Sequence, residues 1–584
     1  MRYPTLKELP TSRQMVDAFR GYNHNLRISD GEFFNMENMT SDCYPVLSPR
    51  GRRGLFARPA SPQGIIAKET VCYVDGTEFV KGNSRVDMSL STDEKDCPKQ
   101  LVSMGAYVII MPDKKYINTI NMEDYGDIEA SYTTQENVEF SLCTITGEQY
   151  SGAVVSSSAP ENPKNMDLWI DTSSKPHTLK RYTDSSSMWV SIATTYIKLS
   201  SPGIGSHFRQ YDGVTIAGVK NALKELNGTV VVQACDDDFI VVIGILDEVT
   251  TQSVQEGRIT IERRMPNMDF VIESGNRLWG CRYGTAINGD VVNEIYASKL
   301  GDFRNWNCFM GISTDSYAAS CGTDGRFTGA ITHLGYPLFF KENCVHKVFG
   351  QFPSNFQIQD TACRGVQQGC HNSLAIVNET LFYKSRSGIC AFDGSLPTEA
   401  SYVLGNEAYS DAVGGSHGNK YYVSMKDRDG AWHLFVFDTA KGMWHREDNL
   451  HAAAFCSCRG EMYCIDASSR NIITMMGSGE EDEGKVKWMV ETGELGISSP
   501  DMKYISRINI RMSMDIGSEM DIYARYDLDE EWVHVCNIRG TNLRSFSIPI
   551  KPRRCDHMKL KIVGEGAGKI YSLTKTIEQG SDIS

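Results

Sequence analysis

The stretch from Val271 to Gly284 reads VIESGNRLWGCRYG, and three later stretches repeat its pattern. Each has a Gly or Asn turn residue, a short apolar and aromatic strand, a polar break and a second short strand. The later stretches are NEIYASKLGDFRNWNCF (293–309), LGYPLFFKENCVHKVFG (334–350) and NETLFYKSRSGICAFDG (378–394). Short strands rich in aromatic and β-branched residues, bounded by Gly, Asn and Asp, predict antiparallel hairpins.

The spacing of these hairpins predicts a β-propeller. The steps from Phe339 to Phe382, then to Tyr422, then to Tyr463 are 43, 40 and 41 residues, and a four-stranded blade takes about 40–50 residues. The alternatives are a β-sandwich and a loose run of hairpins. If the blade register is right, four aromatic side chains should be buried between neighbouring blades: Trp279, Phe339, Phe382 and Tyr422.

The fold class expected is all-β: a propeller with a small inserted α+β or β domain and a C-terminal β-sandwich-like sheet. The step from Tyr107 to Trp279 is 172 residues, so a domain is inserted between two blades. About seven alternating strands in the last 100 residues favour a sandwich. The expected parts are an N-terminal arm (1–60), first propeller hairpins (61–123), inserted domain or domains (124–256), main propeller (257–480) and C-terminal β domain (481–584).

The inserted region holds two units. In the first, Trp169 and Trp189 either present flat faces to a sugar ring or pack on each other, and packing is the favoured interpretation because so small a β unit buries little else. In the second, Val219–Leu226 is expected to form a short helix, and Asp236–Asp238 a solvated hairpin turn rather than a metal loop. Because propeller hairpins resume on either side, entry and exit of the insertion should lie close together.

Composition limits the function classes. The chain has 584 residues, with 73 acidic against 59 basic residues and a net charge of −14. That balance argues against a protein that coats nucleic acid, because phosphate binding needs basic patches. No run approaches the roughly 18 apolar residues of a membrane helix, so no membrane span is expected. The N-terminal residues have no apolar core, so no secretory signal is expected either.

A series of short sequence motifs, called words below, runs through the N-terminal region and the repeats. The first words are Phe19, Gly21, Asn23, Ile28, Gly31-Glu32-Phe33, Met36, Asn38-Met39, Pro45, Leu47 and Arg50. The later words are Asn276–Gly280, Asn293–Ser298, Gly301–Trp306, Phe340-Lys341, Val345–Gly350 and Ser387–Gly394. Together they resemble the β-propeller tail-nozzle proteins, also called stabilisation or head-closure proteins, of short-tailed double-stranded-DNA bacteriophages. The resemblance covers about two thirds of the chain.

The resemblance implies a function and partners. It implies a virion structural protein, assembled in the bacterial cytoplasm into a hexameric ring. The ring would contact the portal, its adaptor and other tail proteins, and packaged DNA would pass through its lumen without tight binding. The alternatives are a tail-tip protein that binds a receptor or carbohydrate and, less favoured, a propeller glycoside hydrolase.

Two short segments rich in arginine, called the basic words, are candidate subunit contacts. The first contains Arg50, Arg52 and Arg53, and the second contains Arg553 and Arg554. Each is otherwise a solvated segment or surface turn. If DNA passes through the ring, both words should lie away from the lumen, because arginine there would hold phosphates.

No catalytic motif is found, so the chain is expected to be neither an enzyme nor a cofactor or metal protein. There is no Gly-x-Ser-x-Gly elbow, phosphate loop or His-Glu-x-x-His helix. Cys456, Cys458, Cys464 and His451 have metal-binding side chains but not the paired spacing of a zinc site. Glu407 with Asp411 is the kind of pair a glycosidase uses, but sequence does not give the separation on which that mechanism depends.

Overall fold

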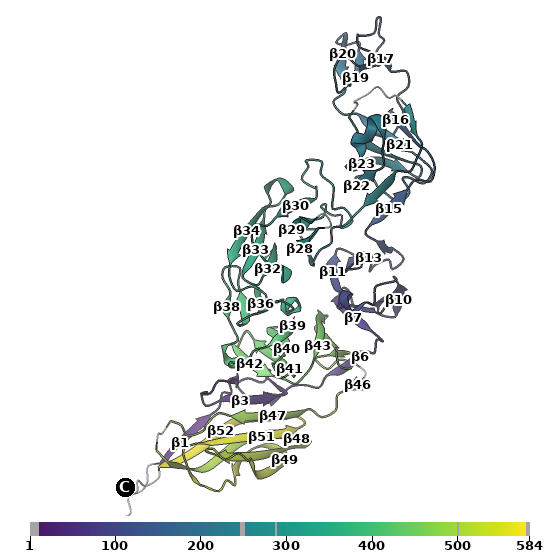
Figure 1. The fold of residues 1–584 in the computed structure, drawn as a ribbon. Coiled ribbons are helices and arrows are strands. Elements are labelled where there is room, and N and C mark those ends of the chain that lie inside the picture. Colours follow the sequence, from purple (N-terminus) through teal and green to yellow (C-terminus); the bar gives the residue numbers. More distant parts are fainter. Residues whose placement is uncertain (1–10, 246–251, 287–288, 480, 499–500, 580–584) are drawn as a thin grey trace, which may run out of the picture. The chain divides into compact units, whose positions relative to one another are not determined.

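The computed structural model describes the chain except residues 1–10, 246–251, 287–288, 480, 499–500 and 580–584 (Figure 1). The fold class predicted from the sequence is confirmed: the chain is all-β, of the β-propeller class, with an inserted β module and a C-terminal sandwich-like sheet. No helix of the described residues is long and apolar enough to cross a membrane. The chain divides into two compact units, one formed by residues 1–99, 340–345 and 361–584 and the other by 100–339 and 346–360.

Propeller sheets in the second unit are four-stranded, and consecutive strands are neighbours in each. The inner strands of consecutive sheets contact each other, β11 with β27 and β27 with β31. The strands are β11 (Gln100–Met104), β12 (Tyr107–Met111), β13 (Lys115–Asn118), β14 (Tyr125–Asp127), β27 (Phe270–Ser274), β28 (Arg277–Thr285), β29 (Val291–Ala297), β30 (Tyr317–Ser320), β31 (Gly329–His333), β32 (Tyr336–Lys341), β33 (Cys344–Phe349) and β34 (Gln357–Ala362).

Propeller sheets in the first unit repeat this plan, and β35, β39, β43 and β7 follow one another in contact. The strands are β7 (Pro62–Ala67), β8 (Val71–Asp75), β9 (Glu78–Lys81), β10 (Ser84–Asp87), β35 (Ala375–Val377), β36 (Thr380–Ser385), β37 (Gly388–Phe392), β38 (Thr398–Glu399), β39 (Ser410–His417), β40 (Lys420–Lys426), β41 (Trp432–Asp438), β42 (Met443–Arg446), β43 (Ala452–Cys458), β44 (Glu461–Asp466) and β45 (Ile472–Thr474). The sheet of β43, β44 and β45 is completed by β6 (Gly54–Ala57) from the N-terminal region and by β46 (Glu481–Asp482).

The predicted aromatic register is confirmed. Trp279, Phe339, Phe382 and Tyr422 are each at most 3% exposed. The Phe382 ring stacks on Tyr421 of the next sheet, with 5.3 Å between ring centroids. The regular spacing of hairpins therefore reflects the stacking of one apolar sheet face on the next.

The inserted module lies between β14 and β27. Its eight-stranded sheet has the order β15-β26-β22-β23-β24-β21-β16-β25, and a small sheet has the order β17-β18-β19-β20. The strands are β15 (Ala130–Thr133), β16 (Val138–Cys143), β17 (Val154–Ser156), β18 (Leu168–Asp171), β19 (Thr178–Thr183), β20 (Met188–Ser191), β21 (Tyr196–Ser200), β22 (Gly213–Ala217), β23 (Gly228–Asp236), β24 (Phe239–Ile243), β25 (Gln252–Gln255) and β26 (Thr260–Arg263). The boundary expected at residue 256 falls before β26, which pairs with β15 and β22.

Two local expectations for the insertion can be compared with the structure. The helix expected at Val219–Leu226 is a 3-10 turn, η2 (Asn221–Leu226), with Leu223 and Leu226 in the core of the module. The other short 3-10 turns are η1 (Glu94–Asp96), η3 (Pro353–Asn355), η4 (His371–Ser373) and η5 (Tyr402–Leu404). Asp236–Asp238 form the exposed turn between β23 and β24, as predicted.

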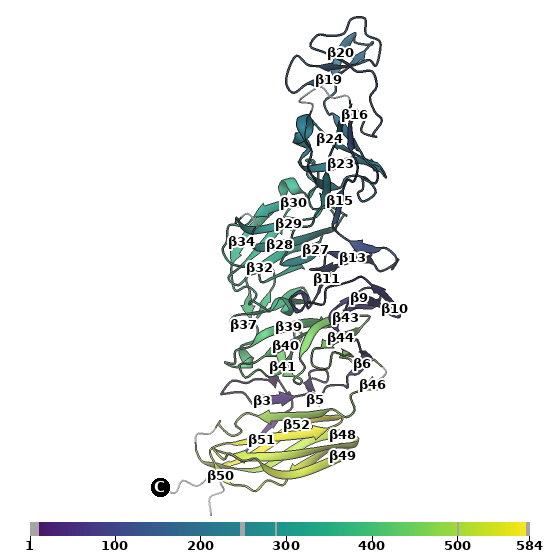
Figure 2. The ribbon, with the colours of Figure 1, turned by 45° about the vertical axis from the view of Figure 1, so that its right-hand side comes forward.

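The C-terminal sheet contains nine strands and includes the N-terminal region. Its order is β1-β52-β48-β51-β47-β3-β2, and β49 and β50 also pair with β48. The strands are β1 (Thr11–Val16), β2 (Gly21–Tyr22), β3 (Glu32–Glu37), β47 (Lys487–Thr492), β48 (Lys503–Tyr526), β49 (Val533–Ile548), β50 (Arg554–Cys555), β51 (Met558–Glu565) and β52 (Gly568–Gln579); a separate two-stranded ladder joins β4 (Met39–Thr40) and β5 (Ser48–Pro49). Figure 2 shows β48, β49, β51 and β52 side by side. The segment expected as an arm (1–60) thus contributes β1, β2, β3 and β6 to sheets that the rest of the first unit completes.

Candidate functional site

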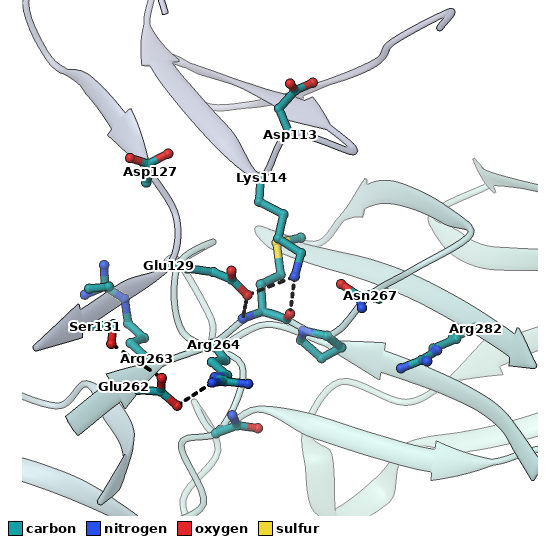
Figure 3. Close-up of a pocket in the computed structure, with 14 residues that line it drawn as sticks. Asp113, Lys114, Asp127, Glu129, Ser131, Glu262, Arg263, Arg264, Asn267 and Arg282 are labelled. Carbon is teal, nitrogen blue, oxygen red and sulfur yellow. Dashed lines mark hydrogen bonds and ion pairs between the residues drawn. The ribbon is translucent and has the colours of Figure 1, made fainter. Parts of the chain in front are cut away.

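A polar cavity of about 670 Å³ lies at the root of the insertion in the second unit (Figure 3). The chain leaves β14 through Glu129 into β15, and it returns from β26 through Arg264 towards β27. These two crossings lie side by side, because Ala130 is the cross-strand partner of Arg263. The predicted proximity of entry and exit is therefore confirmed, and the cavity forms beneath the joint.

One ion pair fastens the joint to the turn before β13. Lys114 Nζ lies 2.8 Å from Glu129 Oε1 and also donates to the carbonyl oxygen of Met265 at 2.8 Å. The same Glu129 oxygen accepts the Met265 backbone N–H at 3.0 Å. Lys114 and Glu129 thus connect the outgoing and returning segments of the chain, and Figure 3 shows their ion pair as a dashed line.

A second ion pair also lines the cavity. Arg264 Nη2 lies 2.7 Å from Glu262 Oε2. The hydrogen bond from Arg264 lowers the pKa of Glu262, and the same bond raises the pKa of Arg264. A carboxyl group held ionised in this way is not prepared to act as a general acid, which requires a raised pKa.

Arg263 lines the cavity and reaches into the base of the insertion. Its Nη1 lies 2.6 Å from Asp212 Oδ2, and both side chains are at most 7% exposed. Its Nε donates to the carbonyl oxygen of Ile128 at 3.2 Å. Next to this pair, Asn305 accepts the Gly213 N–H and donates to the carbonyl oxygen of Tyr211. The arrangement anchors the insertion to the propeller sheet of β27–β30.

The remaining polar side chains of the lining are Asp113, Asp127, Ser131, Asn267, Arg282 and Asn307. Four acidic and four basic side chains line the cavity, so their formal charges cancel, and the pairs described above use several of them. No group of three or more His, Cys, Asp or Glu side chains that could hold a metal ion occurs in the described part of the chain. The cavity is suited to a small polar ligand or to water. The ion pairs described above connect segments of the chain to one another. Sequence reasoning missed it because its lining comes from strands and turns that are far apart in the chain and share no motif.

The two tryptophans of the insertion pack on each other. Their ring centroids are 5.4 Å apart at 67°, an edge-on arrangement. Trp169 is 6% exposed, donates its indole N–H to the Ser156 carbonyl oxygen, and lies under Lys180 Nζ at 4.7 Å from its ring centroid. A buried and covered ring does not offer a flat face to a sugar.

The basic words differ in their surroundings. Arg50 and Arg53, considered as subunit contacts, lie inside the first unit, each with 7% of its surface exposed. They pair with carboxylates that the chain itself supplies, so they present no surface to another subunit. Arg52 is exposed. Arg553 is exposed and lies 2.6 Å from Asp529, and Arg554 is exposed in β50.

The candidate metal and catalytic residues are not brought into a site. Cys464 is fully buried, and burial raises the pKa of Cys456 to about 12. A thiol with a raised pKa is a poor metal ligand, because the thiolate is the form that binds. Glu407 and Asp411 are both exposed, near and within β39.

No family model matches the sequence, and no curated protein matches it. Among solved structures, a galactose complex of the exo-β-1,3-galactanase of Phanerochaete chrysosporium is 9% identical, covers 52% of this chain and 94% of its own, and has a TM-score of 0.20. The endosialidase of phage phi92 is 8% identical, covers 75% and 68%, and scores 0.22. The sialidase of Trypanosoma rangeli is 8% identical, covers 90% and 95%, and scores 0.17.

These comparisons correct one expectation. The galactanase, the endosialidase and the sialidase are enzymes, which contradicts the expectation that the chain is not one. One of the three comes from a phage, and none of the three is a tail-nozzle protein. At TM-scores of 0.17 to 0.22 the likenesses assign no activity or substrate to this chain.

Proposed function

We propose that this chain is a structural protein of a bacteriophage tail, a nozzle that forms a ring below the portal and adaptor and continues the DNA channel. The observation that supports this proposal is the fold of the N-terminal words that resemble the nozzle family. They form a buried junction between two parts of the first unit, the sheet of β43–β45 and the C-terminal sheet.

The backbone of the N-terminal region belongs to both parts. β3 pairs with β47 of the C-terminal sheet, and β6 pairs with β45. Between them, the Asn38 N–H donates to the Glu447 carbonyl oxygen at 2.7 Å, and its side chain donates to the Lys487 carbonyl oxygen at 2.8 Å. Met36 and Met39 next to it are at most 1% exposed. One short segment therefore connects both parts by main-chain bonds and apolar packing.

Two buried arginines strengthen the junction. Arg50 donates from both terminal nitrogens to the two carboxylate oxygens of Glu483, each at 2.6 Å. Arg53 donates to Asp448 at 2.6 Å and to Glu447 at 2.7 Å. Paired, charge-assisted hydrogen bonds fix orientation as well as distance. A ring that closes a head filled with DNA under pressure needs such resistance to separation of its parts.

The charge of the chain also fits a conduit. Acidic walls repel the duplex over a Debye length of about 8 Å at physiological salt, and the chain carries 73 acidic against 59 basic residues. Burial of Arg50 and Arg53 removes two of the three arginines of the first basic word from any surface that DNA passes.

The test is the location of the protein and its effect on DNA retention. Gold-labelled antibody on virions should mark the axis between head and tail, and the purified full-length chain should form radially symmetric rings in negative-stain images. Phage carrying R50A and R53A should lose packaged DNA faster on warming than phage carrying the matched exposed change R52A. Label confined to fibre tips, with normal DNA retention in the double variant, would favour the receptor-binding alternative.

A further inference from the structure

One long strand gives the C-terminal sheet two layers. The first part of β48, Lys503–Met514, pairs with β52, and the second part, Glu519–Tyr526, pairs with β51. β49 runs along the other side of both parts. The first layer therefore has the strand order β1-β52-β48-β49, and it contains the Thr541–Ile548 half of β49.

The first layer ends in two edges. Among the described strands, β1 pairs with β52 alone and β49 with β48 alone. Both edge strands are largely exposed, including Met15 at 63% and Leu543 at 45%. An edge strand presents a row of backbone donors and acceptors, and it is a template for the addition of another strand.

The polarity of the layer determines what fits beside it. Each of its neighbouring pairs is antiparallel, so β1 and β49 run in opposite directions. Suppose that a second copy is placed beside the first with its strands running in the same directions. Its β1 then lies antiparallel to β49 of the first copy. With an even number of strands, the layer can thus continue from copy to copy. The six residues of β1 also fit within the eight residues of Thr541–Ile548.

We infer that β1 of one copy adds to the Thr541–Ile548 edge of the next copy, and that this strand pair is the head-to-tail contact of the ring. The inference rests on the proposed function, which requires a ring. A head-to-tail contact uses two different surfaces and closes a ring, whereas β49 paired with β49 about a two-fold axis gives a dimer. The two-fold arrangement would also bring the Arg544 side chains of both copies together and leave β1 unused.

Charge gives a direct test of this contact. Arg13 lies near the middle of β1 and Arg544 near the middle of the Thr541–Ile548 edge, and no ion pair of the described residues includes either. In an antiparallel pair of these segments the two arginines become neighbours. Like charges across strands destabilise a pair and opposite charges stabilise it. R13E alone or R544E alone should therefore tighten the assembly, and the R13E/R544E double variant should cancel the gain.

The measurement is the protein concentration at which the full-length ring half dissociates, followed by light scattering after size exclusion. Each single reversal should lower that concentration about two- to fivefold, and the double variant should return it to near the wild-type value. The matched control is R507E, an exposed arginine in the first part of β48, away from both edges; it should leave the concentration unchanged. Thermal melting of each variant checks that the fold is retained.

Three outcomes would overturn the inference: a chain that stays monomeric at every concentration, reversals that act no differently from R507E, or an effect of R544E without one of R13E. The proposed function is tested separately by virion imaging. If rings form at the head–tail axis but neither charge reversal changes their half-dissociation concentration, this contact is refuted and the proposed nozzle function still stands. Assembly that responds to the reversals, in a protein absent from virion tails, would refute the nozzle and leave the contact.

Discussion

Arg53 Nη1 lies 2.6 Å from Oδ2 of Asp448, although 395 positions separate the two residues in the chain. The side chain of Arg53 is 7% exposed and that of Asp448 22%. Burial is the largest single effect and raises the pKa of Asp448. The charge and hydrogen bond of Arg53, with the charge of Arg50 and the Leu450 backbone N–H, together outweigh it and the pKa is lowered. The pair closes the first unit between its N-terminal region and the loop before β43.

Removing Arg53 should destabilise the first unit strongly. In R53A the carboxylates of Glu447 and Asp448 lose their close partner and keep only Arg50, at 3.7 and 3.4 Å. Breaking one side of a buried ion pair costs about 3–5 kcal/mol. Urea unfolding followed by circular dichroism measures the loss. The neighbouring exposed change R52A is the control and should stay within about 0.5 kcal/mol of the wild type. Equal stability of both variants would mean that the cluster does not hold the junction.

The stability should fall with acid from about pH 6.5 because of His445. Burial lowers the pKa of His445 from 6.5 to about 3. Between pH 3 and pH 6.5 the unfolded chain therefore binds a proton that the folded chain excludes. Stability is then complete above pH 6.5 and decreases as the pH falls, by about 2 kcal/mol between pH 6.5 and 5. Urea midpoints across pH 5–7.5 should slope in the wild type and flatten in H445Q. An equal slope in both would place the proton uptake elsewhere.

Phe382→Ala should cost about 3–5 kcal/mol, because a large buried aromatic ring leaves a cavity between two sheets. The ring is 3% exposed and stacks on Tyr421. The control is Phe56→Ala, where the ring is 39% exposed, and it should cost less than half as much. Denaturant midpoints give both values, and a small effect at Phe382 would contradict the stacking of these sheets as the source of stability.

The inserted module should be removable at the Thr133–Thr260 pair. These residues are cross-strand partners, and their hydroxyl oxygens are 3.1 Å apart, so an Asn-Gly turn should close the gap between them. The Lys114–Glu129 ion pair remains, and Arg263 becomes solvated once Asp212 is absent. The shortened chain should unfold in one cooperative transition with strand content retained. Insolubility or loss of the β signal would show that the module is part of the propeller core.

The purified chain should not bind duplex DNA tightly. Its net charge of −14 opposes binding of phosphates, and Arg50 and Arg53 are buried in ion pairs. Tight binding would need many phosphate contacts, each of which adds counterion release. Mobility shift at about 150 mM salt should show no submicromolar complex. A tight complex, or a clearly basic channel in the imaged ring, would refute the conduit and return the question to the receptor-binding alternative.

The sequence by itself determined the local order of this protein. The hairpin words, their spacing of about 41 residues and the aromatic positions such as Phe382 and Tyr422 follow from patterns that neighbouring residues share, so the all-β propeller class and the buried rings were predictable. The side-by-side entry and exit of the insertion followed from the hairpins that resume beyond it. The turn at Asp236–Asp238 was also predictable, because three acidic residues between two apolar strands are determined by the local sequence.

Only the tertiary structure decided which distant residues meet. Arg50 and Arg53 look like a solvated basic word until Glu447, Asp448 and Glu483 are folded against them, because their partners lie about 400 positions away. The cavity at the insertion root likewise collects turns from both ends of a long insertion. The joining of predicted strands into the single β48, and the two open edges beside it, depend on sheet order. Strand periodicity specifies which face of a strand is buried, but it does not specify the neighbour on either side.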